Sequence, residues 1–258
     1  MTSIEPALIW MPTLLLVTAR VAGVMLAAPV LGHSVVPVKV RVLVAVGIGL
    51  AAVGRLADPV RLPPHWPDLA VGLGCELLLG FAIGYAARLI FAGVELGAFH
   101  VAQQMGLSLA QVANPLAADA PSSVRGLLRL LAVVVFLAVG GHRALIGGLM
   151  QTFRTVPPLG FVPAAGMTNT IAAMLGASFV LALKVAAPVL IALLLATVAL
   201  GLLHRTMPQC NLLSVGLPTR AMLGLLVLAA TLGVLAPLID AAAGQIGLGV
   251  RALTQGAR

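Results

Sequence analysis

The sequence predicts an all-α membrane protein with about six long hydrophobic helices arranged as hairpins. Apolar residues make up 61% of the 258 residues and charged residues only 9%, whereas a soluble domain carries roughly 25% charged residues. The 7 acidic and 15 basic side chains are too few to cover the surface of a soluble fold of this length. We therefore expect lipid or neighbouring subunits to surround the helices.

Six apolar runs approach the length of about twenty residues that crosses roughly 30 Å of hydrocarbon. Pro, Gly or charged residues separate them. The predicted helices are Pro6–Ala28, Val35–Ala57, Leu69–Phe91, Val124–Gly141, Ile171–Leu203 and Ala221–Ile239. The last two carry the strongest signals, because 185–203 and 221–238 contain no charged residue. No internal repeat is visible, which disfavours a transporter built from repeats. We expect a single domain over residues 1–258.

The basic residues are scattered, which argues against nucleic-acid binding despite a net charge of +8. Dispersed cations suit helix ends near a membrane surface. On alternate loops of the six-helix arrangement, one side collects Lys39, Arg41, Arg88, Arg125, Arg129, Arg205 and Arg220, and the other Arg55, Arg61, Arg143, Arg154, Arg251 and Arg258. This even division does not orient the protein. Either a helix is miscounted, or some segments do not cross the bilayer in the simple way.

Charged residues also interrupt the apolar runs. A charge at the centre of a bilayer helix costs at least roughly 2.5 to 3.5 kcal/mol, so it should face other helices, water or an opposite charge. We expect Arg20 and Arg129 to extend toward an interface, as long basic side chains do. Glu76 is too short for this and should have a buried partner, for which Lys184 is a possible choice.

Two glycine pairs have the spacing that permits close helix contact. Gly80 with Gly84, and Gly93 with Gly97, both match the small-xxx-small pattern. Without side chains, two backbones can approach and gain dispersion contacts. Glycine is also common in membrane helices generally. For either pair alone, this general frequency explains the spacing as well as close helix contact does.

The sequence offers little sign of catalysis. It lacks HExxH, a GxxxxGK[ST] phosphate loop and a GxSxG elbow. The five histidines are far apart in sequence, and Cys75 and Cys210 are too isolated for a zinc site or a disulfide scaffold. We therefore expect no enzyme activity, metal or cofactor.

Four segments in order resemble one family, the flagellar type III export-apparatus family FliR with its virulence-secretion counterparts. The first runs from Arg20 through 28-APVLG-32 to 36-VPVKVR-41. The second is 76-ELLLGFAIG-84 continuing to 103-QQMG-106, and the third is Gly141-His142 followed by 157-PPLG-160. The fourth and most specific is 203-LHRTMPQCN-211 followed by 215-VGLP-218.

The resemblance implies two functional segments. One resembles the family's plug loop, which projects into the export channel and helps to close it; its residues here are Met105, Gly106, Leu109, Val112, Asn114 and Pro115. Apolar side chains suit such a gate, because they exclude water and ions by dewetting. The other, with Arg205, Pro208, Gln209 and Asn211, resembles a turn that contacts partner subunits. Without the resemblance, each segment would read as an ordinary loop or turn.

The function implied is that of a component of the export gate, forming part of the channel through which unfolded proteins cross the inner membrane. Its implied partners are FliP-like and FliQ-like subunits, FlhB and FlhA, the substrates in transit and membrane lipid. Its implied place is the bacterial inner membrane, at a flagellar basal body or injectisome base. A transporter of small solutes or ions that uses Glu76 and Lys184 is the alternative. A membrane-embedded enzyme is disfavoured by the absence of motifs.

Overall fold

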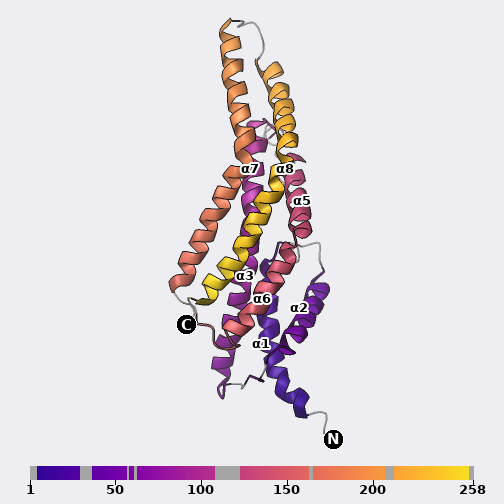
Figure 1. Cartoon of the computed structure of the whole chain (residues 1–258), viewed down its shortest axis with the longest axis vertical. Coiled ribbons are helices and arrows are strands. Elements are labelled where there is room, and N and C mark those ends of the chain that lie inside the picture. Colours follow the sequence, from indigo (N-terminus) through magenta and orange to yellow (C-terminus); the bar gives the residue numbers. More distant parts are fainter. Residues whose placement is uncertain are drawn as a thin grey trace. The chain divides into compact units, whose positions relative to one another are not determined.

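The computed structural model describes residues 5–29, 37–56, 58–60, 63–107, 123–162, 165–206 and 212–255. Seven α-helices and no strand lie in these ranges, which confirms the all-α class (Figure 1). The helices are α1 (Glu5–Ala27), α2 (Val38–Val53), α3 (Trp66–Gln104), α5 (Ser123–Ala138), α6 (Gly141–Thr155), α7 (Ala165–Thr206) and α8 (Leu212–Gln255).

Four helices, α1, α3, α7 and α8, are long and apolar enough to cross a membrane, and the broken pair α5 and α6 could supply a fifth span. The predicted number of six is therefore approximate. The helix α6 is an addition to the prediction, because His142, Arg143 and Arg154 break its apolar pattern. The helices α3 and α8 are each longer than predicted, since the polar residues Glu95, His100 and Asp240 do not end them.

The chain divides into two compact units, and the continuous helices α3, α7 and α8 contribute residues to both. Unit 1 contains residues 1–89, 140–175 and 243–258, and unit 2 contains residues 90–139 and 176–242. The expectation of one functional domain over residues 1–258 stays a prediction.

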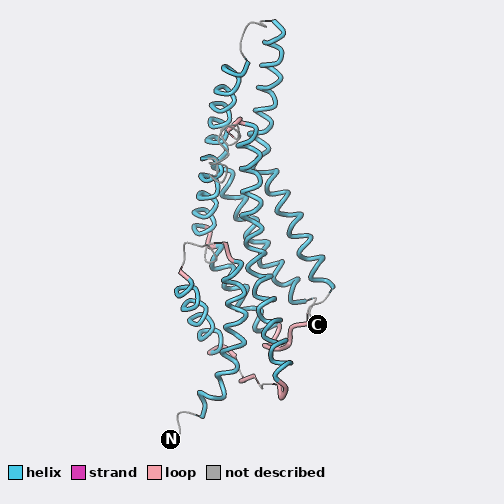
Figure 2. Tube along the Cα trace, turned by 180° about the vertical axis from the view of Figure 1, so that it is seen from behind, coloured by secondary structure: helices cyan, strands magenta, loops and turns pink. Residues whose placement is uncertain are grey.

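In unit 1, the core lies between α1, α2, α6 and the first part of α3. The side chains of Leu16, Leu79, Ile83 and Leu149 are among the largest that are fully buried. The helix α2 packs against α1 and runs back alongside it (Figures 1 and 2). Gly49 of α2 lies against Thr18 of α1, which sets the register of this pair.

In unit 2, α3 packs against α5, α7 and α8. Phe91 and Phe136 join α3 to α5 with ring centroids 5.1 Å apart in an edge-on arrangement. Gly93 and Gly97 of α3 face the backbone of α7, where an added Cβ would lie 2.6 Å from the carbonyl oxygen of Ser178 and 2.7 Å from that of Ala182. These glycines thus occupy positions where only hydrogen fits.

The other glycine pair joins α3 to α1 in unit 1. A Cβ at Gly80 would overlap the carbonyl oxygen of Arg20, and one at Gly84 would lie 2.6 Å from that of Val24. Gly23 of α1 faces α3 in the same way, against the backbone of Leu77 and Phe81. The two backbones are therefore close enough that the short side chain of Glu76 can reach across from α3 to α1.

Replacing Gly80 by Ala should destabilise the protein, because the new methyl group meets backbone that cannot move aside. Overpacking typically costs about 1 to 3 kcal/mol. Gly74 on the same helix is the matched control, since a Cβ there meets nothing within 4 Å. Gly74→Ala should be neutral or slightly stabilising, because Ala favours helices over Gly. Thermal unfolding of the chain, purified in detergent together with the proteins that copurify with it, measures both; equal melting temperatures for the two variants would contradict the close packing.

Candidate functional site: a buried ion pair and the end of α3

A buried ion pair joins α1 and α3 at the centre of unit 1. The Nε of Arg20 donates to Oε2 of Glu76 at 2.6 Å, and Nη2 donates to Oε1 at 3.0 Å. Both side chains are 0% exposed. This is a bidentate arginine–carboxylate pair, in which two parallel hydrogen bonds fix the relative orientation of the two groups as well as their distance.

The same two side chains also hold α6 and the turn that follows it. Nη1 of Arg20 donates to the hydroxyl of Thr152 at 3.2 Å and to the carbonyl oxygen of Val156 at 3.1 Å. The guanidinium carbon lies 4.5 Å from the centre of the Phe153 ring, within range of a cation–π contact. Four hydrogen bonds and one ring contact therefore replace the water that the buried Arg20 cation has lost.

The carboxylate of Glu76 completes the network by ordering a turn. Its Oε1 accepts a hydrogen bond from the amide of Leu159 at 2.9 Å. Leu159 has φ = 70°, a left-handed conformation that is costly for a side chain with a Cβ. Gly72 leaves room for the Leu159 side chain, and the Gly160 amide closes the turn onto the Pro157 carbonyl at 2.9 Å. Glu76 thus stabilises the backbone conformation of the Pro157–Gly160 turn.

The structure changes two predictions about these charges. Arg20, and not Lys184, is the partner of Glu76, and Arg20 is fully buried instead of extending to an interface. The physical reason is the close α1–α3 contact at Gly80 and Gly23, which places the two residues at the same level. Lys184 lies exposed on α7 in unit 2. Arg129 pairs with Glu95 at 3.2 Å, on a half-exposed surface.

The predicted plug segment begins where α3 ends. Gly106 has φ = 79°, the Leu107 amide donates to the Ala102 carbonyl, and the Gly106 amide donates to that of Gln103. This pair of bonds is a Schellman motif, which ends a helix at a left-handed glycine. Leu109, Val112, Asn114 and Pro115 lie outside the described residues.

Met105 anchors this helix end within unit 2. Its side chain is 1% exposed and lies against Gly224 of α8, where an added Cβ would come within 2.6 Å of it. The flexible thioether fills the space that Gly224 leaves. Of the predicted subunit-contact residues, Arg205 is exposed near the end of α7, whereas Pro208, Gln209 and Asn211 lie outside the described residues.

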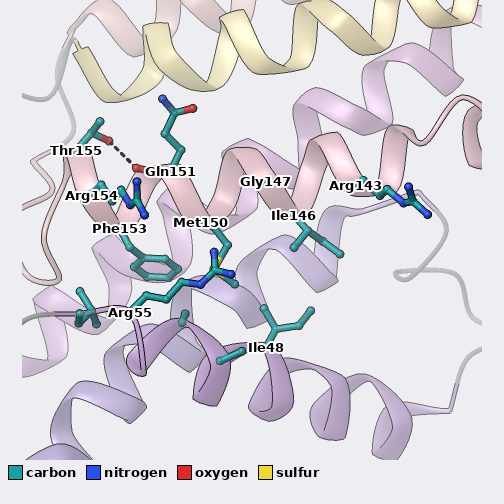
Figure 3. Close-up of a pocket in the computed structure, with 13 residues that line it drawn as sticks. Ile48, Arg55, Arg143, Ile146, Gly147, Met150, Gln151, Phe153, Arg154 and Thr155 are labelled. Carbon is teal, nitrogen blue, oxygen red and sulfur yellow. Dashed lines mark hydrogen bonds between the residues drawn. The ribbon is translucent and has the colours of Figure 1, made fainter.

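A groove of about 800 Å³ lies between α2 and α6 in unit 1 (Figure 3). Ile48, Ile146, Met150 and Phe153 give it apolar walls. Arg55, Arg143 and Arg154 also line it, and no carboxylate does. Figure 3 shows Arg143 and Arg154 toward opposite ends of α6, with Arg55 reaching across from α2 beneath Met150. Within the described ranges, no group of three His, Cys, Asp or Glu side chains could hold a metal.

Sequence reasoning selected Arg20 and Glu76 individually, as charges inside apolar runs, but missed that they pair. Nothing in the sequence around Thr152 and Leu159 indicates that they belong to the network. Their roles depend on atoms of α1 and α3 that are more than eighty positions away along the chain. Charge inside an apolar helix was the only available indication of the network.

Replacing Glu76 by Gln should strongly destabilise the protein, because it leaves the Arg20 cation buried without its counter-charge. Removing one partner of a buried pair costs about 3 to 5 kcal/mol. Glu95→Gln is the matched control, since its pair with Arg129 is about half exposed and such pairs contribute roughly 0 to 1 kcal/mol. Thermal unfolding of the chain, purified in detergent together with the proteins that copurify with it, compares the two. The double change Arg20→Met with Glu76→Gln should recover part of the loss. A Glu76→Gln variant as stable as Glu95→Gln would refute the network's role.

Comparison with known proteins places this architecture in a family. Residues 11–246 match the family described as "Bacterial export proteins, family 1". The chain is 31% identical over 225 residues to the flagellar biosynthetic protein FliR of Escherichia coli (strain K12), covering 86% of this chain and 84% of that protein. It is 28% identical over 229 residues to FliR of Bacillus subtilis (strain 168), covering 87% of each.

A virulence-secretion protein matches as well. The chain is 29% identical over 159 residues, 60% of each chain, to the Yop proteins translocation protein T of Yersinia pestis. The match to the family model extends from within α1 to within α8 and so includes both compact units. The chain belongs to the bacterial export proteins, family 1.

Proposed function

We propose that this protein is a subunit of a type III export gate, flagellar or of the virulence-secretion kind, and forms part of the channel through which unfolded proteins cross the inner membrane. The names of its relatives, flagellar biosynthetic protein and Yop translocation protein, support a role in type III export. The role is that of a structural component, in which the helices line and hold a conduit.

The observation that carries the proposal is the length and exposure of α7 and α8. Their apolar stretches contain 38 and 37 residues, and within an apolar segment of 18 residues in each, only 33% and 22% of the residues are buried. At about 1.5 Å per residue each is roughly 55 Å long, well beyond the roughly 30 Å of hydrocarbon in a bilayer. Lipid alone cannot cover such helices, whereas neighbouring subunits can.

The proposed neighbours are FliP-like and FliQ-like subunits, with FlhB and FlhA in the same apparatus. The exposed leucines and valines of α7 and α8 support this assembly, because apolar surfaces of more than a few hundred Å² mark interaction sites. The proposed location is the bacterial inner membrane, at a flagellar basal body or injectisome base.

The alternative of a solute transporter finds less support. It assigns a coupling role to Glu76 with Lys184, but both oxygens of the Glu76 carboxylate are held by Arg20 and the Leu159 amide. A carboxylate in a full set of strong hydrogen bonds suits a fixed structural position better than a group that exchanges ions.

Deleting the gene should abolish secretion of type III substrates, and with it motility if the system is flagellar. The tagged chain, extracted in mild detergent, should copurify with FliP-like and FliQ-like proteins, and it should aggregate when produced alone. Mass spectrometry of the copurified proteins tests the assembly. A stable monomer without partners, in cells whose secretion survives the deletion, would remove the basis of the proposal.

The plug assignment makes a separate prediction. Replacing Leu109 and Val112 by Ser should increase ion leakage through the assembled gate, because polar side chains let water wet a constriction. Val162→Ser is the control, since Val162 is exposed after α6 and is not part of the predicted plug segment. Conductance of the assembled complex in planar bilayers measures the leak. Unchanged conductance in the Leu109 and Val112 variant would argue against a plug at this position.

A further inference from the structure

The groove between α2 and α6 has a regular lining on both walls. Its lining residues recur on α6 at positions 143, 146, 147, 150, 151 and 154, and on α2 at positions 48, 51, 52 and 55. This spacing of three and four residues marks one face of each helix. The groove therefore follows α6 for about three turns, roughly 16 Å.

Small residues leave room for a helix backbone to approach both walls. Ala51 of α2 and Gly147 of α6 are exposed, and a Cβ added at Gly147 would meet nothing within 4 Å. Beside them, Ile48, Ile146 and Met150 are half-buried, so apolar surface remains for an occupant to cover. Interfaces between membrane helices are enriched in small residues, because these let two backbones come close. The lining of the groove therefore suits a helix.

The groove has cations toward both of its ends. Arg143 lies in the first turn of α6 and Arg154 in the last, and Arg55 crosses from α2 beneath Met150 (Figure 3). All three arginines are exposed, and among the described residues none of them forms an ion pair with a carboxylate. Since eleven residues are close to three full turns, Arg143 and Arg154 lie on the same face of α6. An occupant should therefore carry a negative charge at each end of an apolar middle.

A phospholipid fits this distribution of charge poorly. Its phosphate lies at one end of its acyl chains, so it neutralises the arginines at one end of the groove and places hydrocarbon against the cation at the other. A cation surrounded by hydrocarbon is costly. Two carboxylates on one face of a helix reach both ends at once, and each can accept two parallel hydrogen bonds from a guanidinium. The charges therefore favour a helix over a lipid.

A second copy of this chain does not supply such a helix. Among the described helices only α3 carries more than one carboxylate, at Asp68, Glu76 and Glu95. Glu76 is fully buried against Arg20, and Glu95 pairs with Arg129. No described helix thus presents two unpaired carboxylates about three turns apart. The occupant should come from a different protein.

We propose that the α2–α6 groove holds an amphipathic helix of another subunit of the export gate, whose apolar face carries two carboxylates about eleven residues apart. Arg143 pairs with one carboxylate and Arg154 with the other, while Arg55 adds a further cation from the α2 wall. The apolar residues between the carboxylates cover Ile146 and Met150, as in other helix-in-groove contacts. Because the helix belongs to a subunit of the same gate, this assignment rests on the proposed function.

Photo-crosslinking in the assembled gate identifies the molecule in the groove. The tagged full chain, purified with its copurifying proteins, carries a photo-crosslinking amino acid at position 51 in the groove. The control carries it at position 50, where Leu50 is 62% exposed and does not line the groove. We expect position 51 to give a product with one partner subunit, within a helix that has two carboxylates about eleven residues apart. Position 50 should not give this product.

Charge reversal tests the role of the arginines. Arg143→Glu with Arg154→Glu should lower the yield of the position 51 product at least about tenfold, because it places like charges together in a desolvated contact. Lys39→Glu with Arg88→Glu is the matched control, since both residues are exposed in unit 1 and neither lines the groove. Lys in place of the two carboxylates of the partner helix should restore the product, which a misfolded chain could not do.

Several results would overturn the proposal. These are crosslinks from position 51 only to lipid, to an exported substrate or to a second copy of this chain, and a yield that falls equally in the groove and control variants or in neither. If type III subunits still copurify with the chain in those cases, the proposed function stands and only the groove assignment falls. If no such subunit copurifies with the unaltered chain, both fall.

Discussion

The fold of unit 1 depends on one desolvated guanidinium. Arg20 has no water to solvate it, so its charge requires Glu76, the Thr152 hydroxyl, the Val156 carbonyl and the Phe153 ring at fixed positions. A buried pair of this kind contributes little net stability compared with apolar packing. However, any helix arrangement that leaves one of the two charges buried without its partner is strongly destabilised. We infer that it specifies how α1, α3 and α6 meet, in helices whose apolar surfaces alone would allow many registers.

The parts of α3, α7 and α8 that belong to unit 2 follow a different principle. They pack against one another through glycines and aromatic rings, with Gly93 and Gly97 against α7 and Met105 against Gly224, and leave much of their apolar surface uncovered. Such surfaces are stable only where lipid or other subunits cover them. Unit 1 is held by a buried ion pair, whereas the helices in unit 2 leave apolar surface uncovered. This combination suits a protein in which unit 1 folds by its own contacts and the helices of unit 2 are covered only when subunits assemble.

The class of fold could be predicted from composition. A chain with so many apolar and so few charged residues cannot cover its surface with polar groups, so lipid or other protein must surround its helices. Helix limits were harder to predict. Glu95 pairs with Arg129 within unit 2, so α3 continues past a charge that seemed to end it. The helix α6 was missed because residues such as Arg143 and Gln151 face the groove and make its sequence resemble a polar connection. The Arg20–Glu76 pair depends on close backbone approach at Gly80, a three-dimensional fact that spacing along the chain does not contain.

If the proposed function is right, unfolded proteins pass beside the segment that follows Gly106. The most direct measurement arrests a secreted substrate in the gate by fusing it to a domain that cannot unfold, with a photo-crosslinking amino acid at position 109 of this chain. We expect a covalent product between position 109 and the arrested substrate, and none from position 162 on the surface of unit 1. Crosslinks from 109 only to lipid or to partner subunits, while the same substrate is arrested in the gate, would contradict it.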